Sequence, residues 1–334
     1  MTQFAYFGPP GTFTEMALDK FLGDALLLSA LGGDPASGGG VTSGGGAAPG
    51  IEKIATNSPV ATIEAVRAGR AEFACVPIES SLEGSVPATM DALVPDPRAV
   101  VPRVQIFAEV NLDIAFTIAA RAGTDTHSVR TIAAYPVASA QVRESVQRLY
   151  PGADFVTATS NAAAAVDVAE GRADAAVTTR LAAASAGLAV LADGVCDAAD
   201  AVTRFLLIGR PAAPLPRSGA DRTSVVLNLS NEPGSLMLAM NEFASRGIDL
   251  TRIQSRPRRD LERGITMAGQ YHFFLDAVGH IDDAAIAEAL QALYRRAQRV
   301  TFLGSWPMTS GGGAAPPDHR DSAEWLTRIR RGED

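Results

Sequence analysis

An internal repeat is the feature of this sequence that most constrains its fold. Residues 69–75 read Gly-Arg-Ala-Glu-Phe-Ala-Cys, and residues 171–177 read Gly-Arg-Ala-Asp-Ala-Ala-Val, 102 positions later. Each stretch follows a helical pattern that begins at a serine cap, Ser58 or Ser160, and the leading glycine is suited to ending that helix. The match is short and alanine-rich, so chance similarity is the alternative. A true repeat predicts two similar α/β lobes facing each other across a cleft, where small ligands tend to bind.

Composition limits the classes of partner. The chain has 334 residues, enough for two or three domains, and it is 47% hydrophobic and 20% charged. Its net charge is −8 and no basic patch stands out, so we expect no nucleic-acid partner. An anionic substrate would have to be attracted by local groups and not by the overall field.

The N-terminal residues and the cysteines indicate the compartment. Residues 1–7 lack a basic region and a long apolar run, so we expect no signal peptide, no membrane partner and a cytoplasmic location. Cys75 and Cys196 are the only cysteines, which argues against a disulfide framework. The four histidines are scattered, so the sequence predicts no metal site.

Polar residues follow the strand predicted at residues 73–76. Pro77 has no N–H to donate, so we expect the strand to stop or reach a sheet edge there. Glu79, Ser80 and Ser81 come directly after it. Ligands of α/β folds bind at the carboxyl ends of strands, which favours a ligand site here. An ordinary turn with serine caps is the alternative.

A second candidate lies at the first predicted strand, residues 4–7. The turn at residues 8–11 leads into a helix with Thr12 at its N-cap and Glu15 three residues later, the pattern of a capping box. A glycine turn before a helix leaves backbone amides free to hold an anion. An ordinary capped helix is equally compatible with this pattern.

A third candidate lies before the apolar strand predicted at residues 205–208. Thr203 and Arg204 stand at its start, and an arginine there can hold a carboxylate through paired hydrogen bonds. A surface Thr–Arg pair is the alternative. Gln141, on a helix predicted from residue 135 with Leu149 facing inward, is either a ligand-facing amide or an exposed helix residue.

The order of patterns suggests a domain organisation. Strands at 104–108 and 112–119 are expected to cross into the second lobe, and the strand at 205–208 to return to the first. The predicted segments are lobe one (1–103 and 200–210), lobe two (104–199), a glycine-rich surface insertion (32–50), a proline-rich linker (211–222), a βαββαβ ferredoxin-like domain (223–304) and a tail (305–334).

Several ordered motifs together make the chain resemble the prephenate dehydratase family, in the monofunctional bacterial form with a C-terminal ACT domain. They are Gly-Pro-Pro-Gly-Thr-Phe-Thr at 8–14, Val-Pro-Ile-Glu-Ser-Ser-Leu-Glu-Gly-Ser-Val at 76–86, and the segments 136–141, 160–163, 203–205, 231–236 and 254–257. The resemblance spans residues 3–304 and implies an α/β fold. A two-lobed, periplasmic-binding-protein-like catalytic domain with a cleft (3–210) would precede the ACT domain.

The resemblance implies a reaction that needs no cofactor. Prephenate loses its ring carboxylate as CO2 and its ring hydroxyl as water, giving phenylpyruvate for phenylalanine biosynthesis. Departure of hydroxide is the difficult step, so a donor must reach that oxygen. The family assigns an essential role to the residue that is Thr203 here. The implied substrate-binding residues are Thr12, Glu79, Ser80, Ser81, Gln141, Ser160, Asn161, Thr178, Arg204 and Phe205.

The resemblance also implies feedback inhibition by L-phenylalanine bound between ACT domains. The implied effector residues are Asn231, Gly234, Ser235, Leu236, Gln254, Ser255, Arg256 and Pro257. A βαββαβ domain exposes a sheet edge that pairing would cover, so we expect a homodimer or homotetramer.

Three positions depart from the family pattern. Ser80 replaces the usual asparagine, which has a longer reach and a second donor. Ser235 and Gln254 replace alanine and glutamate in the ACT motifs. The alternative functions are an arogenate dehydratase, which performs the same chemistry on a substrate with an amino group in place of the keto group, and a non-catalytic small-molecule sensor, which the Ser80 departure favours.

Overall fold

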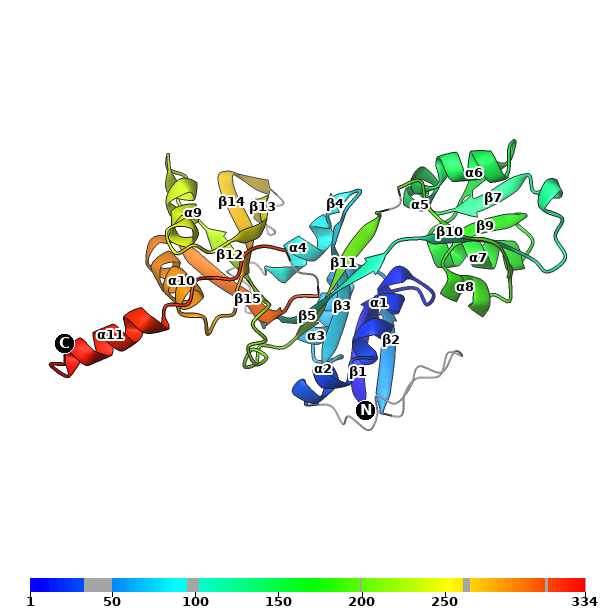
Figure 1. The fold of residues 1–334 in the computed structure, drawn as a ribbon. Helices are drawn as coiled ribbons and strands as arrows, with labels where there is room; N and C mark the ends of the chain where they lie inside the picture. The colour runs from blue at the N-terminus through cyan, green and yellow to red at the C-terminus, as the bar shows by residue number, and fades with distance from the viewer. Residues whose placement is uncertain (33–49, 95–101, 199, 261–264, 310–311, 334) are drawn as a thin grey trace. The chain divides into compact units, whose positions relative to one another are not determined.

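The computed structural model describes residues 1–334 except 33–49, 95–101, 199, 261–264, 310–311 and 334 (Figure 1). The chain divides into two compact units. The first comprises Met1–Thr89 and Val110–Leu207, and the second comprises Met90–Glu109 and Ile208–Asp334. Most of the glycine-rich insertion predicted at 32–50 lies outside the described residues. No helix in the described part of the chain is long and apolar enough to cross a membrane.

Two sheets share the same arrangement; the second belongs to the first unit, and so does most of the first, whose residues 105–109 and 208–209 fall in the second unit. The first sheet has the order β2-β1-β3-β11-β5, and the second has the order β8-β7-β9-β6-β10. The strands of the first are β1 (Thr2–Phe7), β2 (Ile51–Thr56), β3 (Phe73–Ser80), β5 (Gln105–Asp113) and β11 (Val202–Gly209), with β4 (Gly84–Ser85) paired to β3. Those of the second are β6 (Phe116–Ala120), β7 (Thr131–Ala134), β8 (Asp154–Thr157), β9 (Ala175–Thr178) and β10 (Ala189–Val195).

Helices cover these sheets, and their apolar faces form the two cores. The first lobe carries α1 (Phe13–Leu22), α2 (Ala25–Ala30), α3 (Pro59–Arg67) and α4 (Pro87–Leu93). The second carries α5 (Pro136–Gln141), α6 (Arg143–Leu149), α7 (Asn161–Ala169) and α8 (Arg180–Ser185). Successive strand residues face opposite sides, so Ile132 packs with Val142 and Val146 while Ala133 packs with Val168. Figure 1 shows α5 and α6 on one face of this sheet and α7 and α8 on the other.

The predicted repeat is confirmed as a helix–strand unit present once in each lobe. The Ser58 and Ser160 hydroxyls accept from the N–H groups three residues later, at 3.1 and 2.9 Å. Gly69 and Gly171 follow the two helices with φ of 72° and 79°, a conformation that glycine adopts without strain. The strand that follows pairs in parallel with β1 in the first lobe and with β7 in the second.

A carboxylate occupies equivalent positions in the two copies. Glu72 Oε2 accepts from the N–H of Gln3 at 2.6 Å, at the start of β1. Asp174 Oδ2 accepts from the N–H groups of Arg130 and Thr131 and from the Thr131 hydroxyl, each at 2.9 Å, at the start of β7. These donors hold the pKa of Asp174 below its usual value. Each acid therefore ties the beginnings of two adjacent parallel strands together.

The structure corrects the predicted strand ends at two places. Of the two outcomes predicted for Pro77, the strand does not stop there but continues to Ser80. Its register with β1 ends at Cys75, so Pro77 lies beyond that ladder, and Glu79 and Ser80 instead pair with β4 in a hairpin. The strand predicted at 112–119 is divided between β5 and β6, and β5 belongs to the first sheet.

The helix predicted from residue 135 is broken in two. Val142, between α5 and α6, has φ −127° and ψ 13°, and this break rotates the residues that follow. Leu149, predicted to face inward, is 45% exposed as a result. Strands β2 and β8 and helices α4 and α8 were not predicted.

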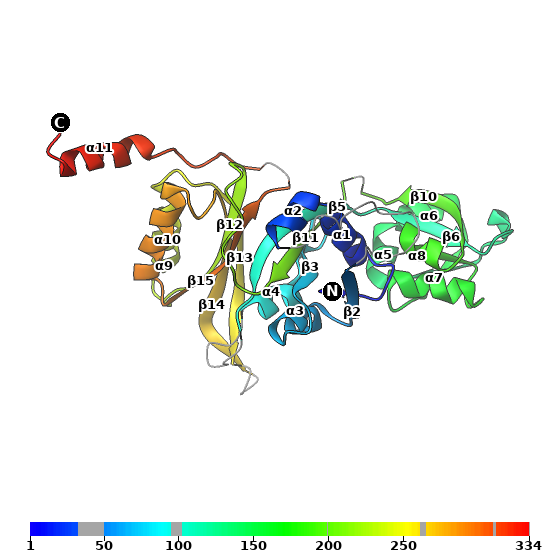
Figure 2. The same cartoon turned by 90° about the horizontal axis from the view of Figure 1, so that it is seen from below.

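The second unit contains the predicted βαββαβ domain. Its elements are β12 (Asp221–Asn228), α9 (Ser235–Ala244), β13 (Leu250–Asp260), β14 (Ile265–Val278), α10 (Ala284–Arg296) and β15 (Arg299–Pro307), followed by the tail helix α11 (Arg320–Arg330). The antiparallel order β13-β14-β12-β15 is the ferredoxin-like order of an ACT-like domain. Helices α9 and α10 lie on one face of the sheet (Figure 2), where Phe243 and Leu293 pack on Val225 and Leu275.

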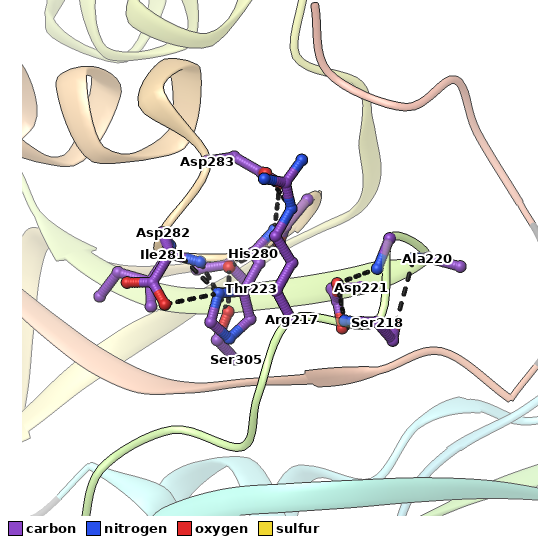
Figure 3. A network of polar contacts seen from close by, with 12 residues as sticks. Arg217, Ser218, Ala220, Asp221, Thr223, His280, Ile281, Asp282, Asp283 and Ser305 are labelled. Atoms are coloured by element: carbon purple, nitrogen blue, oxygen red, sulfur yellow. Dashed lines mark hydrogen bonds and ion pairs between the residues drawn. The ribbon is translucent and has the colours of Figure 1, made fainter. Parts of the chain in front are cut away.

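Part of the predicted linker is fastened to this domain (Figure 3). His280, 1% exposed, accepts from the Asp282 N–H at Nδ1, so its Nε2 carries the proton and donates to the Leu215 carbonyl at 2.9 Å. Arg217 Nε lies 2.8 Å from an Asp283 carboxylate oxygen. Asp221 accepts from Ser218 through both its N–H and its hydroxyl. These contacts explain why β12 begins at Asp221, two residues before the start predicted from the sequence.

The capping carboxylate of the second lobe leads to a prediction for stability. We expect Asp174→Asn to lower the free energy of unfolding by about 1 kcal/mol at neutral pH, because hydrogen bonds to a charged acceptor are lost from a partly exposed site. An acid with a lowered folded pKa stabilises only above its unfolded pKa. The difference from wild type should therefore shrink as the pH falls below about 4.

Urea unfolding at several pH values checks this. Asp154→Asn, an exposed acid on the neighbouring strand β8, is the matched control and should behave like wild type. A loss for Asp174→Asn that stays constant down to pH 2.5 would contradict the proposed capping by the ionised carboxylate.

Candidate active site

The structure brings together the two polar motifs that precede and follow the second lobe in sequence. Strands β3 and β11 are neighbours in the first sheet. The Ser81 N–H donates to the Val202 carbonyl at 2.8 Å, and the Val202 N–H donates to the Ser81 hydroxyl at 3.0 Å. Arg204 Nη2 lies 3.3 Å from Glu79 Oε2. Residues about 120 positions apart thus form one polar cluster.

Side chains on β11 alternate between its two faces. Thr203 and Phe205 share one face and Arg204 lies on the other, because successive strand residues point in opposite directions. Phe205, predicted to bind substrate, is 2% exposed and belongs to the core. The Arg204 side chain is 12% exposed and that of Glu79 is 41% exposed, so the guanidinium is the more deeply placed partner.

Ser80 stabilises the turn of the β3–β4 hairpin. Its hydroxyl accepts from the N–H groups of Leu82 at 3.3 Å and Glu83 at 3.4 Å. Asparagine is favoured in the same kind of turn, since its side chain also bonds backbone groups two residues on. The replacement of asparagine by serine therefore keeps the turn and shortens the side chain.

The glycine turn before α1 is held against the second lobe by a residue that the sequence did not identify. The Thr179 hydroxyl donates to the Gly11 carbonyl at 2.5 Å and accepts from the Ala182 N–H at 3.0 Å. Thr179 is fully buried. Gly11 has φ +88°, and a Cβ there would lie 2.8 Å from the Ala182 Cβ. Thr179 directly follows β9 at the cap of α8, so its position in a Thr-Thr-Arg sequence was the available signal.

The capping interactions at α1 include a backbone amide, that of Gly11, which was expected to be free to bind an anion. Thr12 accepts from the Glu15 N–H at 3.4 Å, as predicted. The Glu15 carboxylate reaches one residue further back than a standard capping box and accepts from the Gly11 N–H at 2.7 Å. The Gly11 amide is therefore bound within the chain.

Ser160, Asn161 and Thr178 meet at the N-terminus of α7. The Ser160 hydroxyl caps the helix, and the buried Thr178 hydroxyl donates to the Asn161 carbonyl at 2.6 Å. Asn161 Oδ1 is buried and has no hydrogen-bond partner among the described residues. Leaving such an atom unsatisfied costs about 1–3 kcal/mol, which marks Asn161 as a residue that a ligand would satisfy.

Gln141 has the same property at the end of α5. Its Oε1 is buried without a hydrogen-bond partner in the described part of the chain. Its carbonyl accepts from the Asp197 N–H at 2.8 Å. The Asp197 carboxylate accepts from the N–H groups of Glu144 and Ser145, at 2.9 and 2.8 Å. Burial raises the pKa of Asp197, but these donors outweigh it and leave the pKa below its usual value.

The two predicted effector motifs are neighbours across β14. Asn231 precedes the cap residue Gly234, and its side chain lies against Gly269 of β14, where a Cβ would overlap it. In the β13–β14 ladder Arg256 pairs with His272 and Pro257 with Tyr271.

Polar contacts hold both of these motifs. The Ser235 hydroxyl contacts the Ser230 and Glu232 carbonyls, both at 2.7 Å, and so closes the loop before α9. Gln254 Nε2 contacts the Ser255 carbonyl at 3.3 Å, while Leu236 is 37% exposed. Burial and the charge of Arg258 lower the pKa of His272 to about 4, so His272 is neutral at pH 7.

No group of three or more His, Cys, Asp or Glu residues in the described ranges could hold a metal ion. The candidate residues described above supply hydroxyls, amides, a guanidinium and a carboxylate. Such a set can bind and orient carboxylates and donate hydrogen bonds to a leaving oxygen.

The fold and these groups define a two-lobed α/β protein with a polar site and a C-terminal ACT-like domain. The family model of prephenate dehydratase matches residues 4–213, and the chain belongs to that family. The prephenate dehydratase of Mycolicibacterium gilvum is 51% identical over 332 residues, which cover 99% of each chain.

Solved structures share the architecture. The prephenate dehydratase of Arthrobacter aurescens in complex with L-Phe is 35% identical, with a TM-score of 0.81 and coverage of 99% of this chain and 100% of that one. A protein described as a novel type of quorum-quenching acylase, GqqA, is 28% identical, with a TM-score of 0.73 and coverage of 92% and 98%. Function on this fold must therefore be argued from the site.

The contact between Gly11 and Ala182 leads to a prediction. We expect Gly11→Ala to destabilise the protein by about 3 kcal/mol, because a left-handed φ strains alanine and the new methyl overlaps that of Ala182. Gly152→Ala is the matched control, since Gly152 has φ +90° and nothing within 4 Å of its added Cβ. It should cost only about 1 kcal/mol.

Urea denaturation of both variants measures the difference. The double variant Gly11→Ala with Ala182→Gly should recover part of the loss. Equal destabilisation by Gly11→Ala and Gly152→Ala would show that the close approach of the two lobes is not what the glycine provides.

Proposed function

We propose that this chain converts prephenate to phenylpyruvate, CO2 and water through the cluster around β3 and β11. Membership of the prephenate dehydratase family over residues 4–213 supports the reaction. The observation that carries the site is the joining of Ser81 to Val202, which places Glu79 beside Arg204.

The chemistry asks little of the protein beyond positioning and hydrogen bonding. The bond from the ring to its carboxylate breaks and CO2 leaves, while the released electron pair completes the aromatic ring. The opposite C–O bond breaks, and the departing hydroxide takes a proton to become water. Aromatisation drives the reaction, so catalysis needs a donor at the departing oxygen and a fixed geometry. No redox step occurs, and we expect no cofactor.

Thr203 is the proposed donor to the departing oxygen. A threonine hydroxyl is a very weak acid, so it stabilises developing charge by hydrogen bonding and relays a proton from a stronger acid. Arg204 is the proposed partner for a substrate carboxylate, with Glu79 orienting its guanidinium.

Asn161 and Gln141 are the proposed substrate-facing amides. Each has a buried oxygen that could accept from the substrate hydroxyl, and a nitrogen that could donate to a carboxylate. By contrast, Thr12, Ser81, Ser160 and Thr178 already bond backbone groups, so their proposed contribution is to shape the site. The proposed catalytic domain spans residues 3–210.

We also propose that L-phenylalanine binds the ACT-like domain, residues 223–304, and inhibits. The relative from Arthrobacter aurescens is described in complex with L-Phe, which supports this ligand. The proposed contacts are the loop at 231–236 and the β13 segment at 254–257, which both lie against β14. A cytoplasmic homodimer or homotetramer is part of the same proposal, because β13 is an edge strand of its sheet.

The catalytic role of Thr203 is tested by removing its hydroxyl. We expect Thr203→Ala to lower kcat by about 10²-fold or more with a small change in KM, because the donor acts on the departing oxygen. Thr203→Ser keeps a hydroxyl and should retain most activity. Phenylpyruvate formation from prephenate is the measurement, with arogenate as a second substrate.

Wild-type activity on arogenate alone would reassign the substrate within the same chemistry. Binding of prephenate without turnover would indicate a sensor. Full activity of Thr203→Ala would remove Thr203 from the mechanism.

The effector site is tested by calorimetry with L-phenylalanine. We expect Asn231→Ala to weaken binding by about tenfold, since a polar contact at a buried ligand is worth about 1–1.5 kcal/mol. Asn241→Ala, an exposed asparagine further along α9, is the control and should bind like wild type. Unchanged affinity in Asn231→Ala would place the effector elsewhere.

A further inference from the structure

Helix α4 is held at successive residues by two different parts of the protein. The Thr89 hydroxyl donates to the Pro77 carbonyl of β3 at 2.6 Å, and Thr89 is fully buried. The next residue, Met90, is also fully buried, and Arg252 Nη2 of β13 lies 3.2 Å from its sulfur. Consecutive helix residues project about 100° apart, so the side chains of Thr89 and Met90 lie on two different sides of α4.

Asp91 continues this second side with an ion pair of favourable geometry. Its Oδ1 accepts from Arg256 Nε at 3.0 Å and its Oδ2 from Arg256 Nη2 at 2.7 Å. Two parallel charge-assisted bonds fix both side chains, which a single contact would not do. The Arg256 side chain is 20% exposed and that of Asp91 is 42% exposed, so we expect a moderate effect.

The β3–β4 hairpin, which carries Glu79, Ser80 and Ser81, lies between Pro77 and α4 in the sequence. Helix α4 begins one residue after Val86, whose N–H donates to the Ile78 carbonyl at 2.9 Å. Between them lies the β3–β4 hairpin, with Glu79 paired in register with Ser85. The hairpin is thus tied at one end by the first sheet and at the other by α4. We therefore expect a shift of α4 to displace the strand that sets Glu79 beside Arg204.

We propose that Asp91 and Arg256 are positioning residues for the dehydratase reaction, acting through α4 on the Glu79–Ser81 hairpin. In this proposal they act only through the backbone of α4 and make no contact with the substrate of their own. Arg256 lies in the segment proposed to bind L-phenylalanine. An effector that engages its guanidinium would therefore release Asp91 and loosen the hairpin. This regulatory part rests on the proposed function.

The experiment compares three variants with wild type in prephenate kinetics. We expect Asp91→Asn and Arg256→Gln to raise KM for prephenate by about two- to fivefold, with kcat changed less. The double variant Asp91→Arg with Arg256→Asp restores opposite charges and should return KM toward the wild-type value. Arg172→Gln is the control, because its ion pair with Asp167 has similar chemistry but lies in the second lobe.

A merely structural pair would lower the thermal midpoint and leave KM unchanged, which would overturn the proposal. A charge-swapped variant no better than the single variants would overturn it as well. Hydrogen exchange of the backbone amides at 78–86 tests whether Asp91 positions the hairpin, and it does so even if the wild-type protein does not turn over prephenate. Faster exchange in Asp91→Asn supports the proposal, and unchanged exchange overturns it.

The regulatory part is judged separately in Asp91→Asn, which leaves Arg256 intact. We expect L-phenylalanine to bind this variant with calorimetric affinity within about threefold of wild type, but to change KM less than it does in wild type. If L-phenylalanine neither binds nor inhibits the wild-type protein, the proposed regulation is wrong. The comparison of KM values still tests the positioning role in that case. Full inhibition of Asp91→Asn would show that the effector signal does not pass through this pair.

Discussion

The return of the chain to its first sheet is the constraint on which the site depends. Strand β11 enters between β3 and β5 after the whole second lobe has been completed. One backbone hydrogen bond and one bond to the Ser81 hydroxyl join Ser81 to Val202 and fix the register of β11 where it begins. Because this contact is made by backbone and a short hydroxyl, it leaves the longer side chains of Glu79 and Arg204 to face each other. The polar cluster is thus a consequence of strand pairing between residues that are far apart in sequence.

Most hydroxyl groups of the candidate site bond backbone groups and so fix its structure, which leaves them less available to a ligand. Thr179, at the cap of α8 in one lobe, bonds the glycine turn of the other lobe. The Thr178 hydroxyl donates to the carbonyl of Asn161 in the first turn of α7. Each hydroxyl donates its hydrogen bond to a buried backbone carbonyl. Leaving such a carbonyl without a partner would cost about 1–3 kcal/mol. The side-chain amides of Asn161 and Gln141 differ from these hydroxyls, because their buried oxygens accept no hydrogen bond within the described residues.

Much of the fold could be predicted because its signals are local. Serine caps, terminal glycines and apolar runs fixed the helix–strand repeat, and the βαββαβ order identified the ferredoxin-like domain. The errors came where long-range pairing overrides local rules. Pro77 ends no strand because its ladder partner has already ended, and the break at Val142 turns Leu149 outward. The roles of Ser81 and Thr178 in fixing the backbone could not be predicted, since a hydroxyl in a motif does not reveal which carbonyl or amide it will meet.

The sequence by itself determined the family, the two-lobed architecture with its ACT-like domain and the set of residue types at the site, because motifs, caps and periodicity act over short stretches of chain. The tertiary structure decided which of those residues meet. It alone placed Asp91 against Arg256, 165 residues apart, and Thr179 against Gly11, 168 residues apart. Contacts of that kind depend on strand order and helix packing, which only the folded chain defines.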